Sequence, residues 1–362
     1  MEKFSAFRDP GTGIQPFLKP VPPTGSETLT AIALPFGYVV GTVRTLLVLI
    51  SGVLYVVLVE GVCLALKPVP PLHRIVTLLL ILGLPWIPVE MVTRKRGRGS
   101  KAPEPWSPGA GDIIVSNWAS TIEILWLAFR VFRFDFPEPS ARVSSPVART
   151  PGRRTGTGSA AISSPAARAP TPRVPIAGFK QVSLFGILRA TGHVPDATQP
   201  GSPGIKSLEE IRSNSDRPVV VFPECATSNG RGLLRFAEIF KGVSVPVTKF
   251  KVFVMCVRYD PPTALSPTMT HSIPSNSINP IPQLFSLTTS LVPLTMSIRL
   301  LAPSESPSSG SFLASEFLTE GTNDDYLTEA CASLIAQIGK MKRVGFGWED
   351  KAAFLEFYNS KK

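Results

Sequence analysis

The chain has 362 residues, 44% of them hydrophobic, and a formal net charge of +11. That length allows one large domain or two small ones with a substantial core. The basic residues gather in two clusters, at 94–101 and at 142–173, that contain no aromatic residues. No nucleic-acid-binding module accompanies them, so the composition argues against nucleic acid as a partner and favours a membrane surface that carries anionic lipid.

The cysteines and histidines limit the chemistry that the chain can perform. The cysteines are widely separated and lack the spacing of metal ligands, which fits a reducing compartment and predicts no metal site. They are Cys63, Cys225, Cys256 and Cys331. The histidines are only His73, His193 and His271. A mechanism that needs several neighbouring histidines is therefore disfavoured.

The first third of the chain predicts attachment to a membrane. Residues 1–28 are polar, which argues against a cleaved secretory signal. Two apolar stretches follow at 31–66 and 75–92, and the first exceeds the roughly 20 residues that a membrane span needs. The basic cluster beside them marks the cytosolic side. We expect a membrane hairpin or a monotopic anchor over 29–93 and a basic linker over 94–110, with two buried core helices as the alternative.

The remainder predicts an α/β domain over 111–302, followed by a C-terminal region, 303–362, of loop and amphipathic helix. The segment 138–175 interrupts the domain. It is rich in Pro, Ser, Gly and Arg and buries too little apolar surface to offset its ordering entropy, so we expect it to be disordered. Its Ser-Pro and Thr-Pro steps are candidate phosphorylation sites.

The expected elements alternate between strands and helices, which predicts a mixed sheet with helices on both faces. Apolar runs predict strands at 112–115, 219–222, 252–258 and 294–301. Helical patterns occur at 122–131, 182–190, 208–214, 233–240, 325–341 and 347–362. Pro- and Ser-rich loops are expected at 261–283 and 303–311.

A candidate site follows the strand at 219–222. Pro223 ends this strand, because proline cannot continue a central ladder. Glu224 therefore lies at the carboxyl end of a buried strand, where open α/β sheets bind their ligands. Thr227, Ser228 and the turn at Gly230 can order backbone N–H groups that suit a phosphate or an oxyanion. The structural alternative is a solvated glutamate at a strand end.

These residues resemble the third motif of the PlsC-type glycerophospholipid acyltransferase family. The resemblance is strongest to its lysophosphatidylcholine acyltransferase branch, and the N-terminal block resembles fungal lysophosphatidic acid:oleoyl-CoA acyltransferases. The matching residues are Phe222-Pro223-Glu224, Thr227, Asn229-Gly230, Lys241-Gly242, Val245-Pro246-Val247, Val257-Arg258-Tyr259 and, at the start, Met1-Glu2-Lys3, Arg8-Asp9, Gly11 to Ile14 and Pro16 to Leu18.

The resemblance implies a PlsC-like domain that transfers an acyl group from acyl-CoA, a co-substrate and not a bound cofactor, to a lysophospholipid. It implies a role in phospholipid or triacylglycerol synthesis at the endoplasmic reticulum or at lipid droplets, with the catalytic domain in the cytosol. By position it assigns Glu123 and Ser120 to catalysis. It assigns substrate binding to Asn117, Glu224, Thr227, Ser228, Asn229, Gly230 and Arg231.

The first motif of the family, Asn-His-x-Ser-x-x-Asp, is altered here. It corresponds to Asn117 through Glu123, with Trp118 at the position of the histidine that acts as general base. An indole has no basic nitrogen, so Trp118 cannot take that role. Activation then rests on Glu123 or on positioning of the substrates. The second motif retains Gly192 but lacks its arginine.

Two other functions remain open. The loss of the histidine favours a catalytically inactive, lipid-binding protein of the same fold that acts in membrane or lipid-droplet organisation. A serine hydrolase ranks last, because the chain has neither a Gly-x-Ser-x-Gly elbow nor a suitable histidine.

Overall fold

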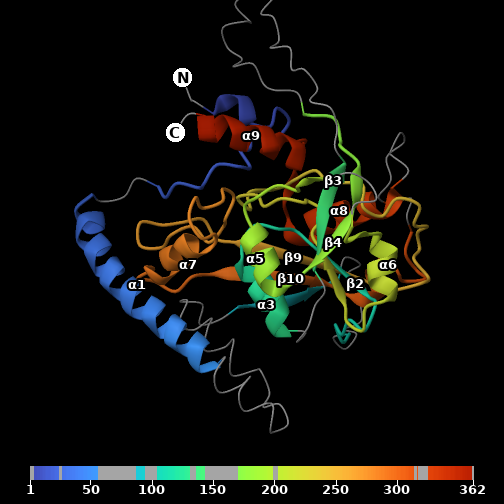
Figure 1. The fold of residues 1–362 in the computed structure, drawn as a ribbon, viewed down its shortest axis with the longest axis horizontal. Coiled ribbons are helices and arrows are strands. Elements are labelled where there is room, and N and C mark those ends of the chain that lie inside the picture. Colours follow the sequence, from blue (N-terminus) through green and yellow to red (C-terminus); the bar gives the residue numbers. More distant parts are fainter. Residues whose placement is uncertain are drawn as a thin grey trace, which may run out of the picture.

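The computed structural model describes residues 4–23, 27–55, 87–93, 104–130, 136–142, 170–198, 203–313, 316 and 325–360. Its centre is a five-stranded sheet in the order β1-β10-β9-β2-β7 (Figure 1). These strands are Val89–Val92 (β1), Ile113–Ser116 (β2), Val219–Val221 (β7), Val252–Tyr259 (β9) and Met296–Leu301 (β10).

The sheet is mixed, and the three neighbouring parallel strands β9, β2 and β7 position the site. β2 pairs in parallel with both β7 and β9, whereas β10 runs antiparallel to β9 and parallel to β1. The strands β7, β2 and β9 consist largely of buried Val, Ile and Phe, the pattern of strands covered on both faces. Because they are parallel, the loops after Ser116, Val221 and Tyr259 meet at one edge of the sheet.

Helices cover both faces of this sheet, as expected for the α/β class. On one face α3 (Ile122–Arg130), α5 (Leu184–Ala190) and α7 (Ile281–Thr288) pack on Ile114, Val220 and Phe253. On the other, α6 (Leu208–Ser213) and α8 (Tyr326–Gly339) pack on Val115, Val219 and Val254. The predictions of α3, α6, α8 and the final helix, α9 (Trp348–Ser360), are confirmed within a few residues.

The prediction of disorder over 138–175 is wrong at both ends. Residues 138–142 belong to β3 (Phe136–Arg142), which pairs with β4 (Ile176–Val182) in a second sheet completed by β5 (Ala197–Thr198) and β6 (Ile205–Lys206). Backbone pairing, and burial of Phe179 in the main core, supply the stabilisation that the composition lacks. Residues 170–175 are held by side chains described below. The positions 143–169 lie outside the described residues.

Two further predictions need correction. Residues 233–240 are not helical: Gly232–Leu233 form strand β8, and the following backbone N–H groups bond to distant segments, for example Ala237 to the Pro223 carbonyl. Burial of apolar residues on both sides of an extended segment overrides the helical spacing. The helix α7 begins within the expected loop 261–283 and was not predicted, and α5 begins at Leu184 because β4 runs to Val182.

The described parts of the predicted membrane segment, 29–93, form one helix and one strand. The helix α1 (Glu27–Tyr55) lies along the outside of the domain and packs on α7 (Figure 1). Just after α7, the Ser290 carbonyl accepts from Arg44 Nη1 at 2.7 Å. Residues 89–92 form β1 at the edge of the main sheet instead of a membrane helix. The positions 56–86 and 94–103 lie outside the described residues. Among the helices that are described, none has the length and apolar character that crossing a membrane requires.

Candidate functional site

The loop after β2 carries the residues of the altered first motif, and it is fixed to the sheet by Asn117. The side chain of Asn117 donates to the Val257 carbonyl at 2.9 Å and accepts from the Val257 N–H at 2.8 Å. Asn117 is buried, and both ends of its amide are occupied by β9. Its observed contacts are therefore with the backbone, and its substrate-binding role stays a prediction.

Glu224 ties this loop to the segment after β8. One carboxylate oxygen accepts from the Trp118 N–H at 2.5 Å, and the other accepts from the Leu234 N–H at 2.7 Å. The side chain is fully buried. The pKa of Glu224 is raised to about 8, mainly by burial, while the Trp118 and Leu234 N–H groups oppose the shift and the nearby Glu123 adds to it. Glu224 thus holds the loop after β2 and the segment after β8 together.

Glu123 lies in the first turn of α3 and folds back on the same loop. Its Oε1 accepts from the N–H groups of Ala119 and Ser120, at 2.5 and 2.8 Å, and its Oε2 accepts from the Tyr259 hydroxyl. Burial raises the pKa of Glu123 to about 7, against the opposing effect of these donors. Two buried carboxyls therefore bind the loop 117–120, and each has a pKa near neutrality.

Trp118 itself belongs to the core. Its indole is 3% exposed and stacks on Phe222, with ring centroids 5.1 Å apart. The indole Nε1 has no hydrogen-bond partner among the described residues. Ser120, the other predicted catalytic residue, is buried and donates to the Met269 carbonyl at 2.6 Å. The Trp118 side chain is therefore packed in the core and offers no basic nitrogen to the site.

The loop from Thr227 to Arg231 is supported from three sides. Thr227 donates to the His271 carbonyl at 2.6 Å. Ser228 accepts from the Gly230 N–H and donates its own N–H to the Trp118 carbonyl. The amide of Asn229 donates to the carbonyls of Gln15 and Leu18 at 2.7 and 2.8 Å, so the N-terminal segment 15–18 binds this loop directly.

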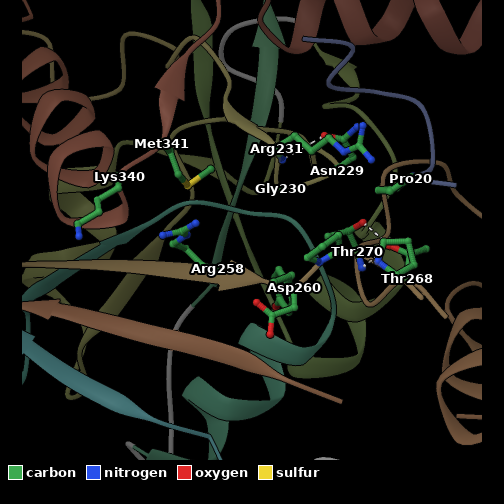
Figure 2. A pocket seen from close by; sticks show the side chains of 13 residues that line it. Pro20, Asn229, Gly230, Arg231, Arg258, Asp260, Thr268, Thr270, Lys340 and Met341 are labelled. Carbon is green, nitrogen blue, oxygen red and sulfur yellow. Dashed lines mark hydrogen bonds between the residues drawn. The ribbon is translucent and has the colours of Figure 1, made fainter. Parts of the chain in front are cut away.

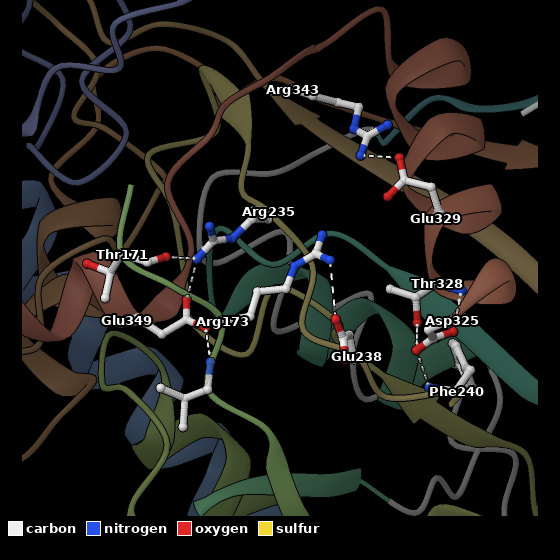
Figure 3. A network of polar contacts seen from close by, with 11 residues as sticks. Thr171, Arg173, Arg235, Glu238, Phe240, Asp325, Thr328, Glu329, Arg343 and Glu349 are labelled. Carbon is white, nitrogen blue, oxygen red and sulfur yellow. Dashed lines mark hydrogen bonds and ion pairs between the residues drawn. The ribbon is translucent and has the colours of Figure 1, made fainter. Parts of the chain in front are cut away.

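A fourth support is α9, whose first turn contacts both the loop and the segment 170–175. Lys351 is fully buried and donates to the carbonyl and hydroxyl oxygens of Thr227. On the other side of the turn, Asp350 accepts from the Thr171 N–H and hydroxyl. Glu349 accepts from Arg235, whose guanidinium also donates to the Thr171 carbonyl (Figure 3). The first turn of α9 thus connects 170–175 with the site loop.

A cavity of about 220 Å³ opens at this edge of the sheet (Figure 2). Asn229, Gly230 and Arg231 line it, together with Tyr259 at the end of β9. Three cationic side chains, those of Arg231, Arg258 and Lys340, also belong to its lining, and in the described part of the chain none of them forms an ion pair or side-chain hydrogen bond. The one carboxylate in the lining, that of Asp260, accepts from the Thr295 hydroxyl. The cavity is therefore suited to an anion.

A second cavity, of about 420 Å³, adjoins the first and is mostly apolar. Both are lined by Pro20, Pro262 and Thr268. The second extends between α1 and α7, where Leu34, Tyr38, Leu265 and Leu291 contribute to its wall. On the outer side α1 exposes a row of large apolar residues, Ile32, Phe36, Val39, Val43, Leu46, Leu47 and Ile50.

The structure therefore divides the predicted site residues into two groups. Asn229, Gly230 and Arg231 reach the basic cavity, whereas Asn117, Ser120, Glu123, Glu224, Thr227 and Ser228 are buried beneath it. His271 is not placed as a substitute base: burial lowers its pKa to about 4, and it bonds to Asn279, not to a carboxylate. Arg258, Tyr259, Lys340 and Lys351 were assigned no site role from the sequence. Arg258 and Tyr259 were signalled by the match of Val257-Arg258-Tyr259 to the resembling family and by their position at a strand end.

Comparison of the chain with protein-family models, with curated proteins and with solved structures found no match. The described ranges contain no group of three or more His, Cys, Asp or Glu side chains placed to hold a metal ion.

Proposed function

We propose that the protein is an acyl-CoA-dependent lysophospholipid acyltransferase of the lysophosphatidic acid type, active in phospholipid or triacylglycerol synthesis. The observation that carries the proposal is the pairing of the two cavities: a basic one above Glu123 and an apolar one that continues from it beneath α1. A single-chain phospholipid has this same division into an anionic head and an apolar tail.

The basic cavity suits the phosphate of such a lipid. Guanidinium and ammonium groups form charge-assisted hydrogen bonds with phosphate oxygens, and arginine can bind two of them at once. Arg258 lies beside Lys340 and Met341, and Arg231 lies beyond Gly230 (Figure 2). Tyr259, which hydrogen-bonds to Glu123, lines the same cavity.

The helix α1 suits a membrane surface. Its apolar row faces away from the domain, and its other side closes the apolar cavity, so a lipid tail passes from bilayer to cavity without crossing water. The basic linker at 94–110 adds attraction to anionic lipid. We place the protein on the endoplasmic reticulum or lipid droplets by α1 and the following apolar stretch, with the α/β domain in the cytosol.

The test is acyl transfer by the purified full chain, with oleoyl-CoA as donor and lysophosphatidic acid as acceptor, on vesicles that contain anionic lipid. We expect transfer by the wild type and a KM for the acceptor raised about 10-fold or more by Arg258→Gln, from the loss of a charge-assisted bond. Arg217→Gln is the matched control, because Arg217 precedes the amino end of β7 at the opposite edge of the sheet. Absence of transfer to any lysophospholipid by the wild type refutes the proposal.

The second candidate is a catalytically inactive lipid-binding protein acting in membrane or lipid-droplet organisation. It is favoured by the packing of Trp118 and by the occupation of both Glu224 oxygens with backbone N–H groups. In that case the wild type binds lysophosphatidic acid in vesicles, Arg258→Gln weakens the binding, and no acyl group is transferred.

A further inference from the structure

Tyr259 is the last residue of β9, and it connects the basic cavity to the buried Glu123. It lines the cavity, and its hydroxyl donates to Glu123 Oε2. Its ring lies against Gly230, where a Cβ atom would approach the ring carbon Cδ2 to 3.8 Å. Glu123 is fully buried. Among the residues that line this cavity, Tyr259 is the one that hydrogen-bonds to Glu123.

The Glu123 carboxyl is held in one orientation. Its Oε1 takes both the Ala119 and the Ser120 N–H, which leaves Oε2 directed at Tyr259. In a nucleophile–base–orienter arrangement a carboxylate holds the base in place toward the substrate. Here the residue that precedes Ala119 in the loop is Trp118, which has no basic nitrogen. The group that the Glu123 carboxylate holds is the Tyr259 phenol, from the neighbouring strand β9.

We propose that Tyr259 is a catalytic residue, and that its hydroxyl, backed by Glu123, takes the proton of the acceptor hydroxyl. The inference rests on the acyl transfer proposed above and adds the group that touches the reacting atoms. It explains how a site without a histidine at position 118 retains a route for the proton.

The step balances as a relay. The acceptor oxygen attacks the thioester carbonyl carbon, and a new C–O bond forms. Its proton passes to the Tyr259 oxygen while the phenolic proton passes to Glu123 Oε2. The C–S bond then breaks, and the CoA sulfur leaves with the electron pair of that bond. The proton returns from Glu123 through Tyr259 to the thiolate, which restores both side chains.

The electrostatics of the pair support a relay. Burial, and then the Glu123 charge, raise the pKa of the Tyr259 phenol well above its ordinary value, so the phenol passes a proton on and does not ionise. Burial raises the pKa of the Glu123 carboxyl to about 7, which suits a base that works near neutrality. The other ionisable groups around Glu123 are Glu224 and Cys256, both buried.

The test compares Tyr259→Phe with wild type in the acyl-transfer assay. The variant keeps the ring and loses the hydroxyl, so we expect kcat to fall roughly 100-fold or more with little change in the KM for lysophosphatidic acid. Tyr326→Phe, on the exposed tyrosine at the start of α8, is the matched control and should retain wild-type kcat. Thermal unfolding of each variant checks the fold.

Three further readouts separate a relay from a structural role. Glu123→Gln should lower kcat similarly, and Tyr259→Phe combined with Glu123→Gln should lower it no further, because the two groups act as one unit. The rise of wild-type kcat through about pH 7 should disappear in Glu123→Gln. Trp118→His in the Tyr259→Phe background should restore part of kcat, since it returns a basic nitrogen to the loop.

The outcomes distinguish the two proposals. If the wild type transfers acyl groups and Tyr259→Phe retains kcat within about 3-fold, the role of Tyr259 is refuted while the acyltransferase function stands. A wild type that binds lysophosphatidic acid but transfers nothing overturns both. Folded Tyr259→Phe with lost kcat, unchanged KM and rescue by Trp118→His supports the relay.

Discussion

The ammonium group of Lys351 is buried and donates to both the carbonyl oxygen of Thr227, at 2.8 Å, and its hydroxyl oxygen, at 3.0 Å. No carboxylate in the described residues lies within ion-pair distance of it. A lysine in this setting is costly to charge, and desolvation lowers its pKa well below the ordinary value while Glu224 partly opposes the shift. The helix α9 thereby holds the site loop through the Lys351 ammonium group, whose pKa is lower in the folded chain than in the unfolded one.

Stability should therefore rise with pH on the alkaline side because of Lys351. Between its lowered folded pKa and the ordinary value of 10.5, the unfolded chain binds more protons than the folded one, so the free energy of unfolding increases with pH. Urea unfolding at several pH values up to 10.5 measures the slope. Lys351→Met should flatten it, and Lys342→Met, on an exposed strand residue, should leave it unchanged.

The two buried carboxyls should give the opposite slope at lower pH. Glu123 and Glu224 have folded pKa values of about 7 and about 8 against an ordinary 4.5, so between these limits the folded state holds protons that the unfolded state has released. Stability then falls as pH rises from about 4.5 to about 8, by at most about 3 kcal/mol for Glu123 and about 5 kcal/mol for Glu224.

The measurement is the free energy of unfolding at pH 5 to 8 in wild type and in a variant that carries Glu123→Gln and Glu224→Gln. We expect a lower stability overall in the variant but a flatter dependence on pH. The exposed Glu356→Gln serves as control and should keep the wild-type slope. An unchanged slope in the double variant contradicts the assignment of raised pKa values to these two carboxyls.

The N-terminal segment should detach from the site loop when Asn229 loses its donors. Asn229→Asp is nearly isosteric, but a carboxylate faces the Gln15 and Leu18 carbonyls with no N–H to offer. We expect a loss of about 1–3 kcal/mol in stability and faster hydrogen exchange in residues 9–19. Asn214→Asp, at the exposed end of α6, is the matched substitution and should change neither quantity.

The packing of α1 on α7 should fail when Gly41 gains a side chain. A Cβ atom at this position would lie 2.6 Å from Thr289 Cγ2 and 3.2 Å from Thr289 Cα, so α1 must move outward. We expect Gly41→Ala to raise hydrogen exchange along α1 and to weaken lysophospholipid binding, because α1 forms one wall of the apolar cavity. Gly310→Ala, where a Cβ has open space, should behave as wild type.

The sequence predicts the centre of this fold better than its periphery. The strands at 112–115, 219–222 and 252–258 are buried apolar runs, and such runs have few alternatives to a central sheet. The segment 233–240 is also rich in apolar residues, and their spacing predicts a helix. Its N–H groups instead donate to distant carbonyls, and the segment is extended. The composition of 138–142 predicts disorder, which is wrong because these residues are ordered by pairing with β4, and their own sequence does not reveal this partner.

The candidate site shows the same limit. Parallel strands bring Trp118 and Glu224 to one edge, as the sequence predicts. Tyr259 and Lys351 were not predicted as site residues, because their partners lie 136 and 124 residues away along the chain. Neither residue belongs to a local motif that involves its partner, and only the folded arrangement connects them.

The supports of the site loop also set the order in which this protein can acquire it. Thr227 and Asn229 are held by residues 124 positions downstream and 211 to 214 positions upstream. A chain emerging from the ribosome contains β2, β7 and β9 before α9 exists, so its loop at 227–231 lacks the Lys351 contacts until synthesis has passed residue 351. Contacts of such long range make folding slow. The carbonyl and hydroxyl oxygens of Thr227 therefore lack their Lys351 contacts until α9 has been made, so the support of this loop is completed only after every strand of the main sheet has been synthesised.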